Sequence, residues 1–403
     1  MPILLQINVT ANWGSTGRIA EEIGQAVICE GWESLIAYGR NKNKSSSQLI
    51  RIGTNFDVYR HVLSTRLFDR NGLSSQGATK KFIKFIEVLK PDIIHLHNIH
   101  GYYLNYPILF KYLSESRIPV VWTLHDCWPF TGHCAYYDYV ECDRWKRECH
   151  DCPQKKGFPA SYMMDRSTKN YNEKKRWFRL VENITLVPVS DWLAAEVRKS
   201  FLGDISIRVI HNGIDPNVFS YTESGVKKKL GIDGKMVILG VASIWDRRKG
   251  LSDFLELRKI LPLEEYVIIL IGLDKRQIKL LPEGIIGVCR TNDIQELVEY
   301  YSMADVFVNP TWEDNFPTVN LEALSCGTPV ITYRTGGSVE AIDGETGFVV
   351  EKGNVREIAD CVHKVKQIGK QFYMRTCRRR VENFFDKKER YSEYLSLYKE
   401  LLG

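Results

Sequence analysis

The chain lacks the features that mark membrane-spanning, disordered and repetitive proteins. No window of its 403 residues approaches 18 uninterrupted apolar residues, and Gly, Pro and Ser form no long low-complexity run. No internal repeat is visible. The N-terminus, MPILLQINVTANWG, has no basic flank followed by a cleavable apolar stretch. We therefore expect a soluble, cytoplasmic protein.

Charge of one sign is also scarce, because the formal net charge is only +6. No recognisable nucleic-acid-reading module accompanies this charge, so we expect no nucleic-acid partner. The hydrophobic fraction of 44% and the aromatic fraction of 11% are instead typical of a globular protein. A chain of this length is too long for one core of ordinary size, which predicts two domains.

A basic run, Lys174-Lys175-Arg176, lies beside Trp177 and Phe178 and has two interpretations. It is either a solvated helix face whose aromatic residues pack inward, or an amphipathic patch that rests on an anionic membrane surface. The second interpretation would place the protein peripherally at the inner face of the membrane, where a lipid-linked acceptor would lie.

Apolar segments of strand length alternate with helical periodicity along the chain. This alternation is typical of parallel sheets with crossover helices. It predicts an α/β fold with two doubly wound, Rossmann-like domains. The predicted strands cover residues 3–9, 33–38, 92–97, 119–125 and 184–190 in the first domain, and residues 236–242, 266–272, 304–310, 328–333 and 346–350 in the second.

The domain boundary is expected in RVIHNGIDPNVF, residues 208–219, where Asn-Gly and Asp-Pro pairs follow a strand. We therefore expect an N-terminal domain over 1–211, with a Cys-rich insertion at about 127–155, and a C-terminal domain over 212–385. Tyr and Leu recur at helical spacing in 386–403. This spacing predicts a terminal helix with one buried stripe, which we expect to pack back on the N-terminal domain.

The segment NPTWEDNFPTVNLEALSCGTPVITYRTGG, residues 309–337, carries the clearest functional pattern. A strand ends at Asn309, a loop carries Asp314, and a helix begins near Thr318. Unpaired N–H groups at a helix N-terminus favour hydroxyls and phosphates at the carboxyl edge of the sheet. Glu322, one turn inside the helix, can accept two hydrogen bonds from a ribose diol.

These motifs together make the chain resemble the family 4 glycosyltransferases of the GT-B fold. The resemblance rests on the acidic loop, LEALSCGTPVI and TGGSVEAI, with HNGID upstream and DGETGFVV downstream. It implies retaining transfer of a sugar from a nucleotide diphosphate, UDP or GDP, to a glycan or lipid-linked acceptor in a cleft between the domains. TLHDCWPFTGHC and the cysteines after it resemble a subgroup linked to colanic-acid-type and other exopolysaccharide, lipopolysaccharide or capsule synthesis.

The family's E-x7-E pair appears here as Asp314 and Glu322. The resemblance implies that Asp314 and the loop after it hold the hydroxyls of the donor sugar, while Glu322 holds ribose. The loop residues assigned to donor binding are Asn315, Phe316 and Pro317.

The resemblance also implies a basic pair that binds the donor diphosphate. In VASIWDRRKG, Lys249 falls on the family's Lys, but Ser243 occupies the position of the usual Arg. Arg247 or Arg248 could supply the missing guanidinium, which grips phosphate oxygens in a bidentate manner. With Lys249 and helix N-termini stabilising the diphosphate, we expect no cofactor in catalysis.

In the first domain, GSTG at 14–17 follows a strand and precedes a helix expected near Arg18. An ordinary turn is one interpretation; the family resemblance implies that Gly17 lies at the donor phosphate or faces the acceptor.

Histidines gather at two further strand ends. The resemblance places His125 against the donor sugar, and Asp126 either orients this imidazole or caps the following loop. His97, Asn98 and Asp126 are assigned to the acceptor side, together with the neighbouring His95 and His100.

Four cysteines within nineteen residues, Cys134, Cys142, Cys149 and Cys152, can close a tetrahedral thiolate site. A structural zinc is one interpretation, with His133 or His150 as a possible replacement for one thiolate. Free thiols, disulfides or redox sensing are the others.

Two rival functions remain open on sequence alone. A phosphorylase or sugar-phosphate synthase on the same fold would differ only in its acceptor. A catalytically silent partner would bind the nucleotide sugar or scaffold a polysaccharide-synthesis complex. The exchanges at Ser243 and Asp314 keep the silent partner in consideration.

Overall fold

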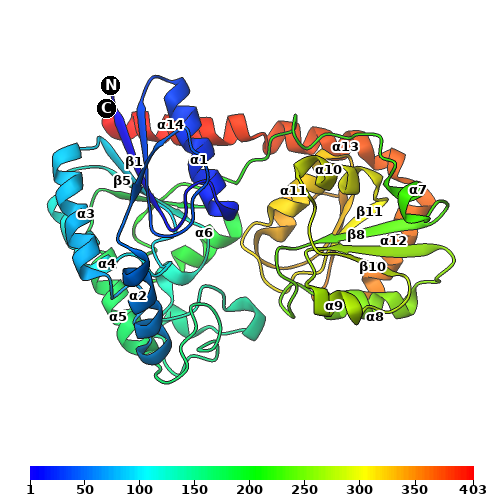
Figure 1. Cartoon of the computed structure of the whole chain (residues 1–403), viewed down its shortest axis with the longest axis horizontal. Helices are drawn as coiled ribbons and strands as arrows, with labels where there is room; N and C mark the ends of the chain where they lie inside the picture. The colour runs from blue at the N-terminus through cyan, green and yellow to red at the C-terminus, as the bar shows by residue number, and fades with distance from the viewer. The chain divides into compact units, whose positions relative to one another are not determined.

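The computed structural model describes residues 1–403 and divides into two compact units (Figure 1). The N-terminal unit comprises Met1–His211 and Tyr391–Gly403, and the C-terminal unit comprises Asn212–Arg390. Each unit contains one parallel sheet with helices packed against it, so the predicted α/β class is confirmed.

The N-terminal unit is built on a seven-stranded sheet in the order β3-β2-β1-β4-β5-β6-β7. The chain passes from one side of β1 to the other between β2 and β4, so the carboxyl ends of β1 and β4 form the topological switch point of the sheet. Its strands are β1 (Ile3–Asn8), β2 (Glu33–Tyr38), β3 (Gln48–Arg51), β4 (Ile93–Leu96), β5 (Val120–Leu124), β6 (Ile184–Pro188) and β7 (Ser206–Ile207).

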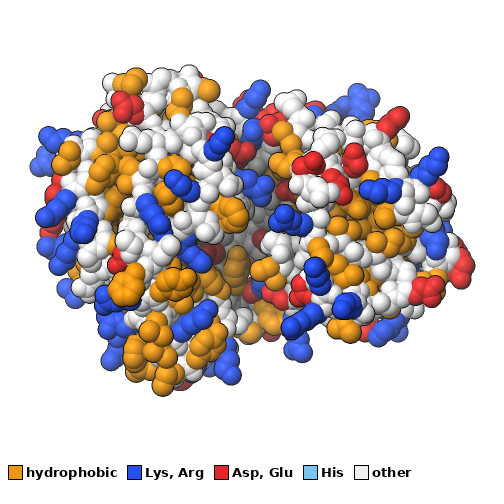
Figure 2. Space-filling model, in the orientation of Figure 1, with side chains coloured by type: hydrophobic (Ala, Val, Ile, Leu, Met, Phe, Trp, Pro, Cys, Tyr) orange, Lys and Arg blue, Asp and Glu red, His pale blue; other side chains and the backbone are white.

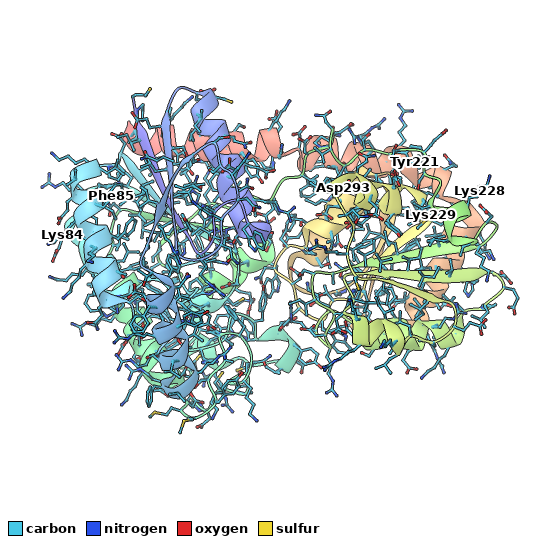
Figure 3. The ribbon with its side chains drawn as sticks, viewed as in Figure 1. Lys84, Phe85, Tyr221, Lys228, Lys229 and Asp293 are labelled. Carbon is cyan, nitrogen blue, oxygen red and sulfur yellow. The ribbon has the colours of Figure 1, made fainter.

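The helices of this unit bury one face and expose the other. In α3, for example, Phe82 and Ile86 are buried one turn apart, whereas Lys84 is exposed on the outer side (Figure 3). The helices are α1 (Gly14–Cys29), α2 (Asn55–Phe68), α3 (Gln76–Leu89), α4 (Tyr106–Glu115), α5 (Ser167–Phe178), α6 (Asp191–Arg198) and α14 (Lys387–Leu402), with 3-10 helices η1 (Trp128–Phe130), η2 (Asp138–Val140) and η3 (Arg144–Lys146).

The C-terminal unit is also built on a parallel sheet, which has six strands in the order β10-β9-β8-β11-β12-β13. The carboxyl ends of β8 and β11 form its switch point. Its elements are β8 (Met236–Val241), β9 (Tyr266–Ile271), β10 (Ile285–Val288), β11 (Val306–Asn309), β12 (Val330–Tyr333), β13 (Gly347–Val350), α7 (Val226–Leu230), α8 (Leu251–Ile260), α9 (Lys275–Lys279), α10 (Ile294–Met303), α11 (Thr318–Ser325), η4 (Gly336–Ala341), α12 (Val355–Ile368) and α13 (Lys370–Phe384).

The helix expected near Arg18 begins four residues earlier, at Gly14. GSTG therefore forms the first helical turn and is not a loop that precedes the helix. Its small and polar residues carry no apolar periodicity. Tertiary contacts hold this turn in place, because the Asn8 amide donates to Thr16 Oγ1 at 3.4 Å and Gly17 packs against Thr10.

The basic run at 174–176 divides between the core and the surface, because Lys175 and Arg176 are exposed. Lys174 is buried, lies over the Trp128 ring at 3.5 Å, and donates to the carbonyls of Trp128 and Thr131 at 2.7 and 3.0 Å. Phe178 is buried in the core. Phe178 thus packs inward as the first interpretation predicts, and one of the cations points inward as well, while Trp177 is half-buried. None of the helices combines the length and the apolar character that crossing a membrane requires.

Helix α14 completes the core of the N-terminal unit with a stripe of tyrosines. Tyr391, Tyr394 and Tyr398 are all buried, and each hydroxyl has a polar partner. The Tyr398 hydroxyl bonds to His95 Nδ1 at 2.6 Å, while His95 Nε2 bonds to Thr123 Oγ1 at 2.7 Å. Both nitrogens of this buried imidazole are therefore satisfied.

Replacing Tyr398 with Phe should destabilise the protein, because His95 Nδ1 would lose its partner in a site without water access. We expect a loss of about 1–3 kcal/mol in the free energy of unfolding, measured by urea denaturation. Tyr59→Phe, at an exposed position of α2, is the matched control and should change little. Equal midpoints for both variants would contradict the role of this hydrogen bond.

Candidate functional site

Two loops meet at the carboxyl edge of the C-terminal sheet, residues 242–250 after β8 and residues 310–317 after β11. Trp312 N donates to the Arg248 carbonyl at 2.8 Å and ties the loops together. Gly250 has a φ of +77°, and a Cβ there would lie 2.2 Å from the Pro310 carbonyl oxygen. A glycine is therefore required at this turn for the loops to approach.

Acidic and basic side chains from the two loops form ion pairs. Lys249 Nζ pairs directly with Asp314 Oδ2, and these side chains are 20% and 18% exposed. Arg248 Nε lies 3.8 Å from Glu313 Oε1, and the Glu313 side chain is only 5% exposed. The structure therefore brings together Lys249 and Asp314 as the motifs predict, and it adds Glu313 as the partner of Arg248.

Packing against neighbouring segments holds the rest of the 310–317 loop in place. Asn315, Phe316 and Pro317 are buried, and the Phe316 ring lies 5.8 Å from that of Phe385. Gly336 has a φ of +47°, and a Cβ there would lie 1.8 Å from the Asp314 carbonyl oxygen. The loop's backbone is thus fixed between neighbouring segments. By contrast, Ser243 and Arg247 are exposed on the 242–250 loop.

Glu322 lies in α11, the helix that follows this loop. Its Oε2 accepts a hydrogen bond of 2.7 Å from the hydroxyl of Tyr301, which is fully buried. Asn320, in the same helix, bonds to Asn309 Nδ2 at 2.8 Å and to the Ser338 hydroxyl at 3.1 Å. These bonds fix α11 against β11 and orient the Glu322 carboxylate.

In the N-terminal unit, Gly17 lies where α1 approaches the loop after β1. A Cβ at Gly17 would lie 2.7 Å from Thr10 Oγ1 and 3.3 Å from Asn12 N, so a side chain would push this loop away. The Asn8 amide donates to the Thr10 carbonyl at 2.9 Å. Gly17 is thus buried where α1 packs beneath this loop.

A chain of hydrogen bonds links Gln6, His97 and His125. Gln6 Nε2 donates to the Ala20 carbonyl at 2.8 Å, so its Oε1 accepts from His97 Nε2 at 3.0 Å. His97 Nδ1 then accepts from His125 Nε2 at 3.1 Å. Burial lowers the pKa of His125 to about 4 and holds the pKa of His97 well below its usual range, so both rings are neutral at pH 7.

The two carboxylate oxygens of Asp126 bond to groups other than His125. One oxygen accepts from Trp128 N at 2.9 Å and caps the following loop, while the other bonds to His100 Nε2 at 2.8 Å. The His100 interaction, which no local motif signals, is the main cause that keeps the Asp126 pKa below its usual range against burial. The loop-capping alternative is therefore correct.

A cavity of about 300 Å³ lies at this edge of the N-terminal unit. It brings together Asn98, His100 and Asp126, which the sequence assigns to the acceptor side, and His97 lies behind them in the buried chain. The other lining residues, which the sequence motifs missed, are Val9, Thr10, Trp13, Arg40, Asn41, Gly101, Tyr136 and Phe158. They come from distant segments, so no spacing pattern could have joined them.

The cysteine cluster lies apart from both loops. Cys134, Cys142, Cys149 and Cys152 line one small cavity together with His133 and His150, and none of the four forms a disulfide. The disulfide interpretation is not supported.

Comparisons with known proteins agree with this arrangement. A family model described as Glycosyltransferase Family 4 matches residues 17–218, and one described as Glycosyl transferases group 1 matches residues 235–367. The chain is 25% identical over 386 residues to the putative colanic acid biosynthesis glycosyl transferase WcaC of Escherichia coli, with 88% of this chain and 89% of that protein covered. Capsular polysaccharide biosynthesis glycosyltransferase CapM of Staphylococcus aureus is 34% identical over 114 residues, which cover 27% of this chain and 30% of that protein.

Solved structures share the architecture. Sucrose-phosphate synthase from Thermosynechococcus elongatus matches with a TM-score of 0.73 and 17% identity over 100% of this chain and 99% of that chain. HepE of Anabaena in complex with UDP matches with a TM-score of 0.70 and 14% identity over 99% and 100%. The predicted GT-B fold is confirmed.

The neutral His125 ring predicts a pH dependence of stability. Its folded pKa, about 4, lies below the ordinary value of 6.5, so the unfolded chain binds more protons between these values. Its contribution to stability is complete above pH 6.5 and is lost as the pH falls toward 4. His125→Asn should reduce the slope of unfolding free energy against pH by up to about 1.4 kcal/mol per unit. Parallel profiles for variant and wild type would contradict the assignment.

Proposed function

The chain belongs to glycosyltransferase family 4, and on this premise we propose that it moves a sugar from a nucleotide diphosphate to a glycan or lipid-linked acceptor with retention of anomeric configuration. The observation that carries the proposal is the Lys249–Asp314 ion pair at the switch point of the C-terminal sheet, with Asp314 in the loop that leads into α11 and Glu322. Ligands bind at such switch points in doubly wound folds.

On binding, the diphosphate of the donor would replace Asp314 as the ion-pair partner of Lys249. In this structure, the Asp314 carboxylate neutralises the ammonium group. A phosphate oxygen offers the same charge and would leave Asp314 available to sugar hydroxyls. The N-terminus of α11 adds N–H donors at this edge. Arg248 is held by Glu313, so the exposed Arg247 is the more mobile source of a second phosphate contact.

Glu322 would bind the ribose diol of the nucleotide. Its carboxylate is oriented by the buried Tyr301 hydroxyl, which leaves acceptor capacity on its oxygens for ligand hydroxyls. UDP is the nucleotide we favour, because a protein of this fold, HepE, has been solved in complex with UDP. GDP is the alternative to be tested beside it.

The transfer itself would proceed on one face of the sugar. The bond from the anomeric carbon to the β-phosphate oxygen breaks, and a bond to the acceptor oxygen forms on the same face. The acceptor proton passes to the departing phosphate oxygen, so atoms and charge balance without a covalent enzyme intermediate. Lys249 and the α11 N–H groups would stabilise the charge that grows on the diphosphate. The neutral His125 would act as a hydrogen-bond partner of the sugar.

The acceptor would enter the 300 Å³ cavity of the N-terminal unit. Trp13 and Phe158, each 49% exposed, offer aromatic surfaces to a sugar ring, while Asn98 and Asp126 offer polar groups for its hydroxyls. WcaC and CapM are named for colanic acid and capsular polysaccharide synthesis. We therefore assign the product to a cell-surface polysaccharide.

Peripheral membrane association would proceed through the outer face of α2. This helix buries His61 and Thr65 but exposes Phe56, Tyr59 and Leu63 by 68%, 74% and 59%. The helix therefore exposes apolar side chains that a helix packed on a globular core would bury.

The neighbouring loop extends this apolar face. Tyr162 N donates to the Arg66 carbonyl at 2.8 Å, which places the exposed Tyr162, Met163 and Met164 next to the exposed Phe68. Figure 2 shows apolar side chains mixed with Lys and Arg over this part of the unit. We name this surface the α2 patch; its residues are Phe56, Tyr59, Arg60, Leu63, Arg66, Phe68, Arg70, Tyr162, Met163 and Met164.

The α2 patch predicts binding to anionic vesicles. Wild-type protein should sediment with vesicles that contain phosphatidylglycerol, and added salt should weaken binding, because each Arg near an anionic surface contributes about 1 kcal/mol. The combined variant Tyr59→Ser, Leu63→Ser, Met163→Ser should lose most binding. Tyr221→Ser, at an exposed tyrosine of the C-terminal unit, is the matched control. Equal sedimentation of variant and wild type would exclude this surface.

The donor assignments predict three distinct kinetic effects. Glu322→Ala should raise the donor KM by about 10- to 150-fold, because ribose contacts are the same in ground and transition states. Lys249→Ala should also depress kcat, because the charge on the diphosphate grows during transfer. Asp314→Ala should weaken the nucleotide sugar more than the free nucleotide diphosphate.

The control for these variants is Glu256→Ala, at an exposed carboxylate of the same unit. An unchanged donor KM and nucleotide affinity in Glu322→Ala would refute the ribose assignment. Binding of nucleotide sugars without turnover across a broad acceptor panel would favour a catalytically silent partner. Consumption of inorganic phosphate would favour a phosphorylase.

A further inference from the structure

The segment between β5 and α5 is long and has little regular structure. Residues 125–166 contain only η1, η2 and η3, each of three residues. Loops beyond about 12–15 residues are uncommon in compact domains unless something else orders them. Yet this segment buries Trp128, Phe130 and Trp145 almost completely. It is therefore ordered, and five of the chain's ten cysteines lie within it.

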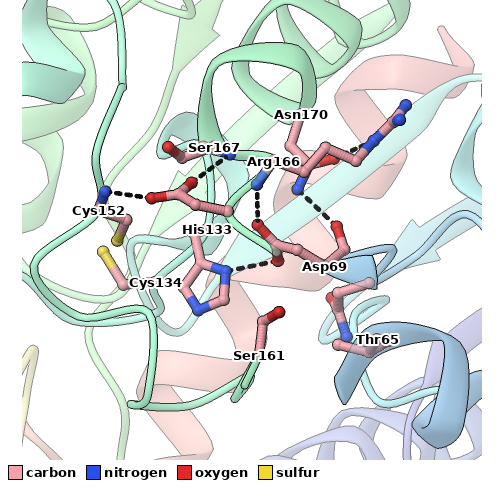
Figure 4. A network of polar contacts seen from close by, with 12 residues as sticks. Thr65, Asp69, His133, Cys134, Cys152, Ser161, Arg166, Ser167 and Asn170 are labelled. Atoms are coloured by element: carbon pink, nitrogen blue, oxygen red, sulfur yellow. Dashed lines mark hydrogen bonds and ion pairs between the residues drawn. The ribbon is translucent and has the colours of Figure 1, made fainter. Parts of the chain in front are cut away.

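Four of these cysteines converge although they come from different turns of the segment. Cys134, Cys142, Cys149 and Cys152 line one cavity of about 10 Å³, which is about the space of a single small sphere. This volume suits one metal ion and is too small for an iron–sulfur cluster. Figure 4 shows the thiols of Cys134 and Cys152 close to one another.

Backbone N–H groups point at two of these sulfur atoms. Gly132 N donates to Cys149 Sγ at 3.2 Å, and the Gln154 N–H donates to the Cys152 thiol. A Cβ at Gly132 would lie 2.7 Å from Cys149 Cβ and 2.2 Å from the Ser167 carbonyl oxygen, so only glycine permits this approach. Hydrogen bonds of this kind orient thiolate ligands and spread their negative charge.

A buried imidazole in the same cavity wall lacks a partner. His133 is 2% exposed, and its Nδ1 bonds to Asp69 Oδ1 at 2.6 Å (Figure 4). Its Nε2 is buried without a hydrogen bond. Buried polar atoms are rarely left unsatisfied, and no protein group in the structure satisfies this nitrogen. The Asp69 carboxylate also accepts from Arg166 N at 2.8 Å, which anchors the cluster to α2 and α5.

We propose that Cys134, Cys142, Cys149 and Cys152 bind one structural Zn²⁺ ion as four thiolates. Soft thiolate ligands in a closed tetrahedral set select zinc among the common divalent ions. The four sulfur atoms do not all lie within 4.8 Å of one another, so they must move together for all of them to reach the ion, and the irregular backbone of this segment permits such a shift. His133 lies in the wall of this cavity beside the ion and is not one of the ligands.

The zinc would also hold one wall of the acceptor cavity; this consequence rests on the proposed function. Ala135, next to the ligand Cys134, donates to the Phe158 carbonyl at 3.1 Å and accepts from Cys127 N at 3.0 Å. Tyr136 and Phe158 both line the 300 Å³ cavity. Loss of zinc should therefore raise the acceptor KM and leave the donor affinity of the C-terminal unit unchanged.

Metal analysis of the full chain tests the site without any activity assay. Protein purified without chelators should contain about one zinc per chain by elemental analysis. Replacement by Co²⁺ should give tetrahedral d–d bands and a strong thiolate-to-cobalt charge-transfer band. Protein without zinc that also fails to take up Zn²⁺ or Co²⁺ after reduction of its thiols would overturn the proposal.

Single substitutions separate ligands from other buried cysteines. Cys149→Ser and Cys152→Ser should lose zinc and unfold at a lower temperature than wild type. Cys127→Ser, in the same segment, and Cys377→Ser, in the C-terminal unit, are buried controls that should keep the metal. Equal zinc content and equal melting temperatures in all four variants would overturn the site.

The ligand set is tested by His133→Gln and Cys142→Ser. His133→Gln should retain zinc, whereas Cys142→Ser should lose it or bind it more weakly. Zinc loss in His133→Gln with full retention in Cys142→Ser would refute the four-thiolate assignment. Failure of the glycosyltransferase assay would leave these metal readouts intact, so the two proposals fail separately.

Discussion

The close approach of two loops in the C-terminal unit is the constraint on which the donor site depends. Gly250 permits residues 242–250 to pack against Pro310, and Gly336 permits η4 to pack against the Asp314 backbone. Both positions combine a left-handed φ with a backbone oxygen too near for any Cβ. Lys249 meets Asp314 because these turns are possible. The ion pair therefore holds an ammonium group and a carboxylate together at one edge of the sheet. A charged ligand can replace one partner of the pair there.

The N-terminal unit contains a network of hydrogen bonds between buried polar side chains. Gln6, His97 and His125 form one directed chain of hydrogen bonds, and His95 is satisfied by Thr123 and Tyr398. Because burial keeps these imidazoles neutral, their role at pH 7 is to orient neighbouring groups and substrate without carrying charge. Helix α14 takes part in this network, which explains why the chain's last segment buries tyrosines and not only leucines.

The sequence predicts the central strands of both sheets but not β3, β7 and β10. All three lie at sheet edges, where strands are short and partly exposed, so their apolar signal is weak. Among the site residues, the Lys249, Asp314 and Glu322 motif is readable because its members lie close in sequence or at a family spacing. The pairing of Arg248 with Glu313 and of Asp126 with His100 is not, because each pairing depends on how separate loops fold together.

The most direct test of the account is proton NMR of a mixture of UDP-sugar or GDP-sugar, a saccharide acceptor and the protein, followed in real time. The account predicts that free nucleotide diphosphate and a new glycosidic anomeric signal appear at equal rates, and that an α-linked donor gives an α-linked product. An inverted anomer would contradict the retaining mechanism. Absence of nucleotide release with every donor and acceptor, from protein that binds the nucleotide, would contradict the assignment as a transferase.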